Sequence, residues 1–178
     1  MEMKNQIKFL FLRYFSLLIL GLGNLFLFYF IFTPLTIYPS FLIMDIFYEA
    51  SLFQNTIIFS GYEANIIPAC IAGSAYYLLL ILNLATPMSP LKRIKSISFL
   101  LGLFLVINIA RIVLFASIFA SKYEIFDIAH SASWYFGSTI LVILLWFSNV
   151  YLFNIKSIPI YTDIKSIINQ IKGKKWVL

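Results

Sequence analysis

Four apolar runs, each about as long as a lipid bilayer is thick, constrain this chain more than any other feature. They cover about residues 14–32, 67–86, 97–119 and 131–153, and a membrane-spanning helix needs about 20 such residues. Of the 178 residues, 62% are hydrophobic and 11% are charged, whereas about 25% are charged in a typical soluble domain. The pattern predicts an all-α integral membrane protein, in which residues 1–178 form one compact bundle of four transmembrane helices.

The segment between the first two runs, residues 33–66, decides whether the helix spans number four or five. Pro34 and Pro39 predict a break after the first span. Two carboxylates in the middle of a bilayer would be costly, so we expect 33–66 to lie on the outer membrane surface, with a fifth span as the alternative. Within it, polar residues at helical spacing predict an amphipathic helix over 40–59; they are Asp45, Tyr48, Glu49 and Asn55.

The end of this outer segment carries a second local signal. Ser60-Gly61 lies between two short β-favouring runs, which predicts a short β-hairpin over 57–66. The hairpin would lead the chain to Cys70, at the start of the second span. Gly73 and Ser74 follow one turn later, and such small residues allow another helix to pack closely.

The basic residues predict which helix ends face the cytoplasm. With the N-terminus inside, all 13 Lys and Arg except Arg111 and Lys122 fall on the inner side, many of them in the tail 154–178. Because inner loops carry such an excess of positive charge, we expect a multi-pass protein of the cytoplasmic membrane. The tail also has the pattern of an amphipathic surface helix over 161–171. The formal charge of +6 is then a topology signal, and no nucleic-acid partner is expected.

Three polar residues converge on the outer side of this topology. Cys70 is the only cysteine, His130 is the only histidine and opens the fourth span, and Arg111 lies about 12 Å below the outer end of the third span. Each has an ordinary interpretation: a packing thiol, an interfacial imidazole, and an arginine held by Asn108 on the same helix face. Their agreement in depth and side supports a shared function, because an intramembrane charge is costly and is normally put to use.

This residue set suits acyl transfer. A Cys70 thiolate would be the nucleophile, His130 would accept the thiol proton, and Arg111 would stabilise an oxyanion or fix the substrate backbone. Asp127 is a candidate to orient the imidazole, in competition with Glu124, Asp45 and Glu49. One Cys and one His are too few ligands for a zinc centre, so neither a metal nor another cofactor is expected.

The same residues resemble a known family. Pro68-Ala69-Cys70-Ile71-Ala72-Gly73 entering a helix, Asn108-Ile109-Ala110-Arg111 in the next helix and His130 before a final Trp- and Gly-bearing helix are similar to the core of the exosortase/archaeosortase family, over about residues 66–147. The resemblance implies a multi-pass cysteine protease or transpeptidase that cleaves C-terminal sorting signals of secreted or surface proteins. It implies a thioacyl intermediate, a lipid or other envelope acceptor, and Cys70 as nucleophile with Arg111 and His130 completing the site.

Two other classes of function fit part of the pattern. A non-catalytic membrane subunit would use Arg111 to bind an anionic lipid headgroup or a partner helix. Replacing Cys70 with Ser separates this reading from an enzyme, because a packing cysteine tolerates the change and a nucleophile does not. A channel or transporter component has less support, since the sequence shows no repeat of broken helices and no paired carboxylates within the spans.

Overall fold

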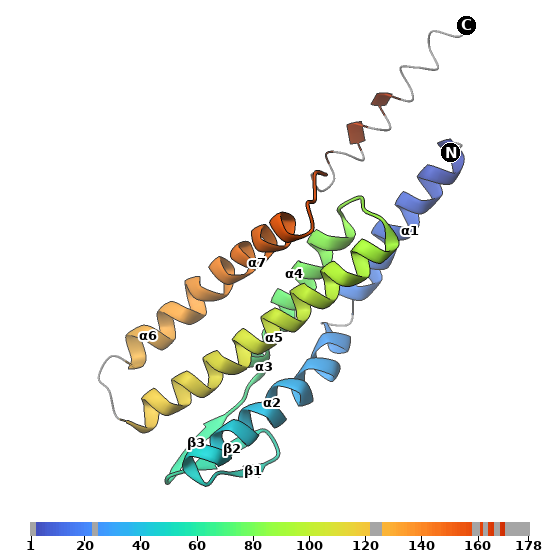
Figure 1. Cartoon of the computed structure of the whole chain (residues 1–178). Helices are drawn as coiled ribbons and strands as arrows, with labels where there is room; N and C mark the ends of the chain where they lie inside the picture. The colour runs from blue at the N-terminus through green and yellow to red at the C-terminus, as the bar shows by residue number, and fades with distance from the viewer. Residues whose placement is uncertain are drawn as a thin grey trace, which may run out of the picture.

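The computed structural model describes residues 3–22, 25–121 and 126–157, with short pieces at 161, 164–165 and 168–169. The chain is mostly helical, with a small antiparallel sheet at one end (Figure 1). The helices are α1 (Met3–Gly21), α2 (Phe26–Tyr48), α3 (Pro68–Ile71), α4 (Gly73–Leu84), α5 (Pro90–Ala120), α6 (Phe126–Ala132), the π-helical segment η1 (Ser133–Gly137) and α7 (Ser138–Leu152). The strands are β1 (Ser51–Phe53), β2 (Thr56–Phe59) and β3 (Tyr62–Asn65).

By length and composition, three helices of the described chain could each cross a membrane. They are α2, α5 and the continuous stretch Phe126–Leu152 made of α6, η1 and α7. The predicted span 97–119 lies inside α5, which begins earlier, at Pro90. The predicted span 67–86 corresponds to a shorter apolar helical segment, Pro68–Leu84, which Ala72 divides into α3 and α4. The chain is thus consistent with a multi-pass membrane protein.

The first predicted span, 14–32, does not form one helix. α1 ends at Gly21, and α2 begins at Phe26 after Leu25, whose φ of 59° is left-handed. The sequence at this junction contains Gly23 and Asn24, residue types that favour helix ends. Apolar length alone therefore misplaced the helix boundary.

The predicted break at Pro34 and Pro39 is wrong, because both prolines lie inside α2. Helices in lipid tolerate proline, since neighbouring helices and local adjustments satisfy the backbone groups that proline frees. The amphipathic helix over 40–59, and the fifth span there, are also wrong. α2 continues to Tyr48, Glu49 follows with a left-handed φ of 49°, and the rest of the segment is β1 and β2. The polar residues of the predicted stripe do not share a helix, because Asp45 and Tyr48 lie in α2 whereas Asn55 lies in the turn between β1 and β2.

The hairpin predicted over 57–66 is confirmed, and it belongs to a sheet with strand order β1-β2-β3. β2 and β3 pair with Phe59 opposite Tyr62. The two turn residues, Ser60 and Gly61, have φ angles of 49° and 79°, and positive φ at both positions gives the turn a twist that matches the strands. The sheet packs against α2, and Ile57 and Phe59 of β2 are only 1% exposed.

An aromatic contact joins three helices in the core. The Tyr76 ring of α4 stacks on Phe32 of α2 with centroids 3.6 Å apart, and it meets Phe104 of α5 edge-on at 4.7 Å. Gly73 allows the close approach of α2 that the sequence predicts, because a Cβ there would lie 2.8 Å from the ring of Tyr29. Ser74 is exposed and takes no part in this packing.

The two ends of the bundle carry opposite charge. The start of α1, the start of α5 and the chain after α7 lie at one end, called here the basic end, and the sheet and the start of α6 lie at the other, the sheet end (Figure 1). The acidic residues of the described chain are all at the sheet end: Asp45, Glu49, Glu63 and Asp127. Lys122 and Glu124, and most of the surface helix predicted over 161–171, lie outside the described residues.

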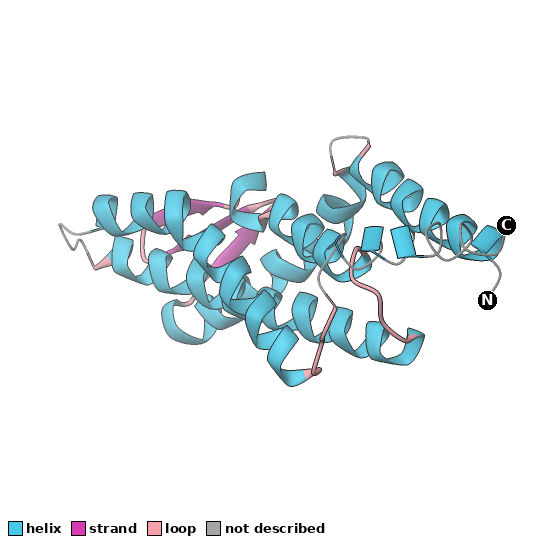
Figure 2. Ribbon diagram, turned by 90° about the horizontal axis from the view of Figure 1, so that it is seen from above, coloured by secondary structure: helices cyan, strands magenta, loops and turns pink. Residues whose placement is uncertain are grey.

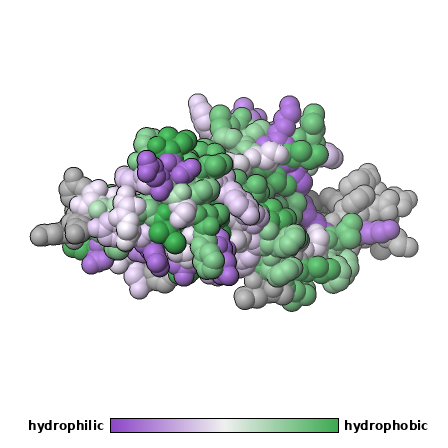
Figure 3. Space-filling model, turned by 90° about the horizontal axis from the view of Figure 1, so that it is seen from below, coloured by the Kyte–Doolittle hydropathy of each residue, from purple (hydrophilic) through white to green (hydrophobic). Residues whose placement is uncertain are grey.

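The sides of the helices are apolar where they face outward. Large hydrophobic side chains are exposed along them, among them Phe11, Phe30, Ile46, Val106 and Phe147. Figure 3 shows broad hydrophobic areas on one face with smaller hydrophilic groups between them, and Figure 2 shows the helices running alongside one another with the strands confined to one end. Exposed apolar areas of this kind are unfavourable in water and typical of a surface that meets lipid.

Candidate functional site

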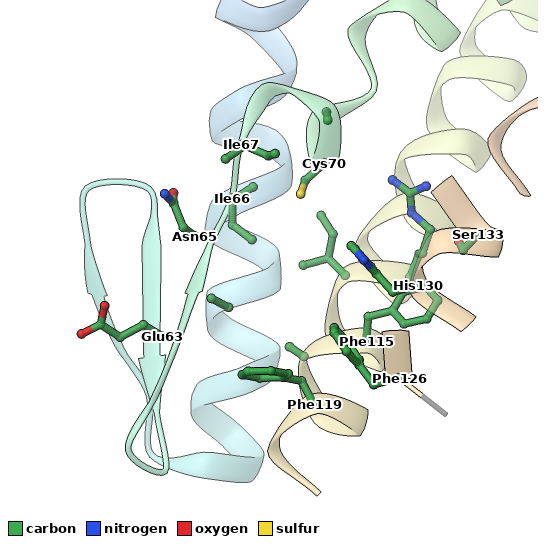
Figure 4. Close-up of a pocket in the computed structure, with 15 residues that line it drawn as sticks. Glu63, Asn65, Ile66, Ile67, Cys70, Phe115, Phe119, Phe126, His130 and Ser133 are labelled. Carbon is green, nitrogen blue, oxygen red and sulfur yellow. The ribbon is translucent and has the colours of Figure 1, made fainter. Parts of the chain in front are cut away.

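A cavity of about 470 Å³ lies at the sheet end, between the chain that joins β3 to α3 on one side and α5 and α6 on the other (Figure 4). Cys70 of α3, Arg111 of α5 and His130 of α6 all line it. Figure 4 shows the Cys70 sulfur pointing into the space between the two walls, with His130 on the wall opposite. The structure thus brings together three residues that are far apart in the sequence.

Cys70 lies in a single helical turn with an abrupt end. Pro68 begins the turn, and Ala72, in the left-handed region with a φ of 58°, ends it. That conformation costs a residue with a Cβ about 1–2 kcal/mol, so surrounding packing must hold it. The break also interrupts the helical hydrogen bonds that would engage the carbonyls of Cys70 and Ile71. The thiol itself is free and half-buried.

Asn108 of α5 satisfies the carbonyls at this break. Its Nδ2 donates to the Cys70 carbonyl oxygen at 2.9 Å and, at 3.5 Å, to that of Ile71. The residue is 1% exposed, and an unpaired carbonyl in an apolar interior costs several kcal/mol. Asn108 therefore holds the turn that carries Cys70 against α5, whereas one interpretation of the sequence was that it pairs with Arg111.

Arg111 reaches from α5 towards the start of α7. Its guanidinium donates to Ser138 Oγ at 3.0 Å, and it lies close enough to Cys70 and Tyr76 to interact with both electrostatically. Within the described residues this is the one hydrogen bond of a group that carries five N–H donors. The cation is therefore fixed at one corner and has donors left for a ligand in the cavity.

His130 is held by aromatic rings. The imidazole stacks on Phe126 with centroids 5.3 Å apart and an angle of 8°, and it meets Phe115 edge-on at 5.4 Å. Asp127, a candidate from the sequence to orient the imidazole, is exposed and does not line the cavity. The acid that does line it is Glu63.

The π-helical segment η1 lies between His130 and Ser138 and sets their relative direction. Two regular helical turns take about 7.2 residues, and a π-helical turn adds about one more. The eight-residue separation of His130 and Ser138 then brings both side chains to the same face of the helix. The imidazole and the hydrogen-bond acceptor of Arg111 consequently face the same neighbour, α5.

Sequence reasoning missed four polar residues of this site. Glu63 and Asn65 of β3 and Ser133 of η1 line the cavity, and Ser138 accepts the hydrogen bond from Arg111. A hydroxyl at the start of an apolar run was the signal for Ser138. No local signal marked the other three, because their place beside Cys70 depends on the path of the chain. The remaining lining is apolar: Ala64, Ile66, Ile67, Ala69, Ile112, Phe115, Ala116, Phe119 and Phe126.

The site therefore joins a thiol, an imidazole and a guanidinium inside a mostly apolar wall. In the part of the chain that the structure describes, no group of three or more His, Cys, Asp or Glu is placed to hold a metal ion. A thiol, a base and a cation that border one cavity are residue types suited to nucleophilic chemistry. Comparisons of this chain with models of known protein families, with curated proteins and with solved structures give no match.

Proposed function

We propose that this chain is a membrane-embedded cysteine protease or transpeptidase that cleaves C-terminal sorting signals of secreted or surface proteins and transfers them to a lipid or other envelope acceptor. The observation that carries the proposal is the shared cavity, into which three separate helices bring Cys70, Arg111 and His130. The substrate class rests on the resemblance of these residues to the exosortase/archaeosortase core.

The reaction would proceed in two halves. His130 takes the thiol proton, the Cys70 sulfur adds to the carbonyl carbon of the scissile peptide bond, and the oxyanion that forms is stabilised by Arg111. When the carbon–nitrogen bond breaks, the imidazolium protonates the departing amine and a thioester remains on Cys70. An acceptor amine or hydroxyl, or water, then attacks the thioester, His130 accepts its proton, and that proton returns to the departing sulfur.

Two features support a position in the cytoplasmic membrane with the cavity towards the outer face. Three helices are long and apolar enough to cross a membrane. The described Lys and Arg residues lie towards the basic end, with Arg111 as the exception, while the acidic residues lie at the sheet end that holds the cavity. The positive-inside rule then directs the basic end to the cytoplasm.

A non-catalytic role is the second candidate. Arg111 lies in a cavity whose walls are mostly apolar, so an anionic headgroup at the guanidinium with an acyl chain along the aromatic wall would also fit. The same cation could instead pair with a partner helix. In either case Cys70 would be a packing residue, and the thiol would be dispensable.

Client processing distinguishes these functions. A client would be a secreted protein that ends in a short motif, an apolar span and a basic cluster, co-expressed with the wild type or with Cys70→Ala, Arg111→Ala or His130→Ala at matched membrane abundance. We expect Cys70→Ala to abolish cleavage and the other two to impair it severely. Asp127→Asn is the control variant, because this exposed side chain lies outside the cavity. Normal processing by Cys70→Ala would overturn the enzyme proposal in favour of the binding subunit.

A further inference from the structure

β3 is an edge strand, and its free edge carries backbone groups with defined directions. Phe59 and Tyr62 flank a two-residue turn, so they form a hydrogen-bonded pair, and such pairs alternate along an antiparallel ladder. Ala64 therefore pairs with β2, and Ile66 does so too, since its N–H donates to Asn55 O at 2.9 Å. The two residues in between, Glu63 and Asn65, direct their N–H and C=O groups away from β2.

These two residues stand beside the cavity. Glu63 and Asn65 line it together with the chain that follows them, and that chain ends at Cys70. In Figure 4 the strand passes from Glu63 and Asn65 through Ile66 and Ile67 up to Cys70. Two outward-facing amides, those of Glu63 and Asn65, thus lie on the chain that continues to Cys70.

We propose that the free edge of β3 binds an extended peptide segment of the client through the main-chain groups of Glu63 and Asn65, and thereby delivers the reacting peptide bond to Cys70. The proposal rests on the proposed function and names how its substrate is held. An extended polypeptide carries amide donors and acceptors at the repeat of a strand, which is why sheet edges bind peptides in this way. The cavity volume is within the range of about 300–1,000 Å³ that is usual for ligand sites.

Topology and charge set the direction of the peptide. A client anchored by its C-terminal span enters the membrane from the outer side, and β3 also runs from the sheet end towards Cys70, so the two chains are parallel. Ile67 is the last residue before the helical turn that carries Cys70. Glu63 lies four residues earlier, which is about 13 Å along an extended chain at about 3.3 Å per residue. The exposed carboxylate of Glu63, which lines the cavity, favours a basic residue about four positions before the reacting carbonyl.

A peptide reagent tests this arrangement on the full-length protein in detergent or lipid nanodiscs. The probe is the chloromethyl ketone of acetyl-Lys-Ala-Val-Ala-Ala, whose methylene carbon accepts the Cys70 sulfur while the carbon–chlorine bond breaks and chloride leaves. The thiol proton passes to His130 or to the buffer. Chloroacetamide, which alkylates a thiol without a peptide backbone, is the reference reagent. Mass spectrometry of the intact protein follows both reactions, each corrected for its rate with a free thiol in solution.

We expect the peptide reagent to alkylate Cys70 at least tenfold faster than the reference. N-methylation of successive amides in the probe should then reduce the rate at every second position, about tenfold each time, because alternate N–H groups face β3. A uniform effect of N-methylation, or none, would overturn the proposal. This series uses the wild-type protein, so it is decided without any question of misfolding.

Substitutions on β3 give the matched test from the protein side. Asn65→Pro removes an N–H that points away from β2, whereas Asn65→Ala removes only the side chain. The proline variant should react several-fold more slowly with the peptide reagent than the alanine variant, which keeps the amide, while the two variants should react alike with chloroacetamide. Equal rates for both variants with the peptide reagent would contradict the proposal. If Asn65→Pro also loses reactivity with chloroacetamide, the site has been disrupted and the N-methyl series decides.

The charge preference is tested by exchange. Glu63→Lys should favour a probe with Glu in place of Lys, and an unchanged preference would remove Glu63 from the peptide site. Failure of this proposal is distinguishable from failure of the proposed function. If Cys70→Ala still processes the client, the enzyme proposal fails whatever the labelling shows. If Cys70→Ala is inactive and the N-methyl pattern is flat, only the β3 proposal fails.

Discussion

Two arginines in the same long helix illustrate how differently the two ends of this molecule use a charge. At the basic end, Arg93 donates to three carbonyl oxygens at the end of α4, those of Asn83, Leu84 and Thr86, at 2.9, 3.2 and 3.0 Å. At the sheet end, Arg111 donates, among the described residues, only to the Ser138 hydroxyl, and it lines a cavity. The first arginine closes a helix end, whereas the second presents donors to a space that a ligand can enter.

The neighbouring polar side chains follow the same division. Near Arg93, Asn83 donates to Ser96, and Ser96 donates to Asn149 Oδ1 at 2.8 Å. These three residues come from α4, α5 and α7, and each is 0% exposed. A polar residue in an apolar helix is therefore not by itself a sign of function. What distinguishes the sheet end is that Arg111 borders a cavity together with a free thiol and an imidazole.

The largest expected effect is the loss of client cleavage when the thiol at the sheet end is replaced. Cys70→Ser keeps the shape of the side chain but replaces the thiol by a hydroxyl that an imidazole activates poorly. Client cleavage should fall on the order of 10⁴-fold or more, as for loss of a nucleophile in other hydrolases. Membrane abundance and thermal unfolding should stay at wild-type values, because the volume hardly changes. Cleavage by the serine variant at the wild-type rate would show that the Cys70 thiol is not needed for the reaction, and the polar residues of the sheet end would then be structural like those of the basic end.

Exchange of arginine for lysine sharpens the comparison, since the same change can be made at both ends. In Arg111→Lys the planar fork is lost where the proposed mechanism places the oxyanion, and client cleavage should fall about 10²–10³-fold. In Arg93→Lys the fork is lost at a helix end, so the protein should unfold at lower temperature while the folded fraction cleaves normally. The measurements are initial cleavage rates and unfolding curves in the same detergent. Equal loss of cleavage in both variants would point to a general effect of helix stability.

An intermediate effect is expected for Asn108, because its hydrogen bond both stabilises the contact between α3 and α5 and positions Cys70. Asn108→Ala removes the donor to the Cys70 carbonyl, so the turn that carries Cys70 loses its hydrogen bond to α5. The free energy of unfolding should fall by about 1–2 kcal/mol, and cleavage should fall about tenfold to 10²-fold because the thiol is less well placed. Chloroacetamide labelling should still reach Cys70, which distinguishes a displaced nucleophile from a lost site. Asn108→Ala with wild-type cleavage would show that the turn is held by packing alone.

The sequence predicted the helical class and the residues that meet at the cavity better than it predicted helix boundaries. Apolar length and the spacing of single polar residues are local quantities, and they located α5 and most of the stretch Phe126–Leu152. His130 was predicted to open that stretch but lies inside α6, which begins at Phe126. The course of 33–66 was predicted wrongly because proline was assumed to end a helix, as it does in water, whereas helices in lipid tolerate proline. β1 and β2 lie within residues 40–59, for which the sequence predicts a helix. Only the hairpin around Ser60 and Gly61 had a sequence signal of its own.

The contacts that Asn108 and β3 make near Cys70 depend on tertiary structure and could not be predicted from the sequence. The bond from Asn108 to the Cys70 carbonyl exists because Ala72 interrupts a helix, and the sequence Ile71-Ala72-Gly73 gives no sign that alanine rather than glycine adopts the left-handed conformation. The proposed role of β3 likewise depends on which of its edges β2 does not pair with. Contacts between segments distant in the sequence cannot be derived from periodicity within either segment.

The smallest expected effect concerns the polar chain at the basic end. Ser96→Ala removes the hydroxyl that links Asn83 to Asn149 and leaves both amides without that partner. Hydrogen bonds between membrane helices contribute on average about 0.6 kcal/mol and at most about 1.7 kcal/mol, so unfolding in mixed detergent micelles should become easier by about 1 kcal/mol. The rate of client cleavage per folded molecule should not change, because the linked side chains lie at the opposite end from the cavity. If Ser96→Ala instead slowed cleavage as much as Asn108→Ala, the two polar clusters would be coupled through α5, and the basic end would have to be counted as part of the functional site.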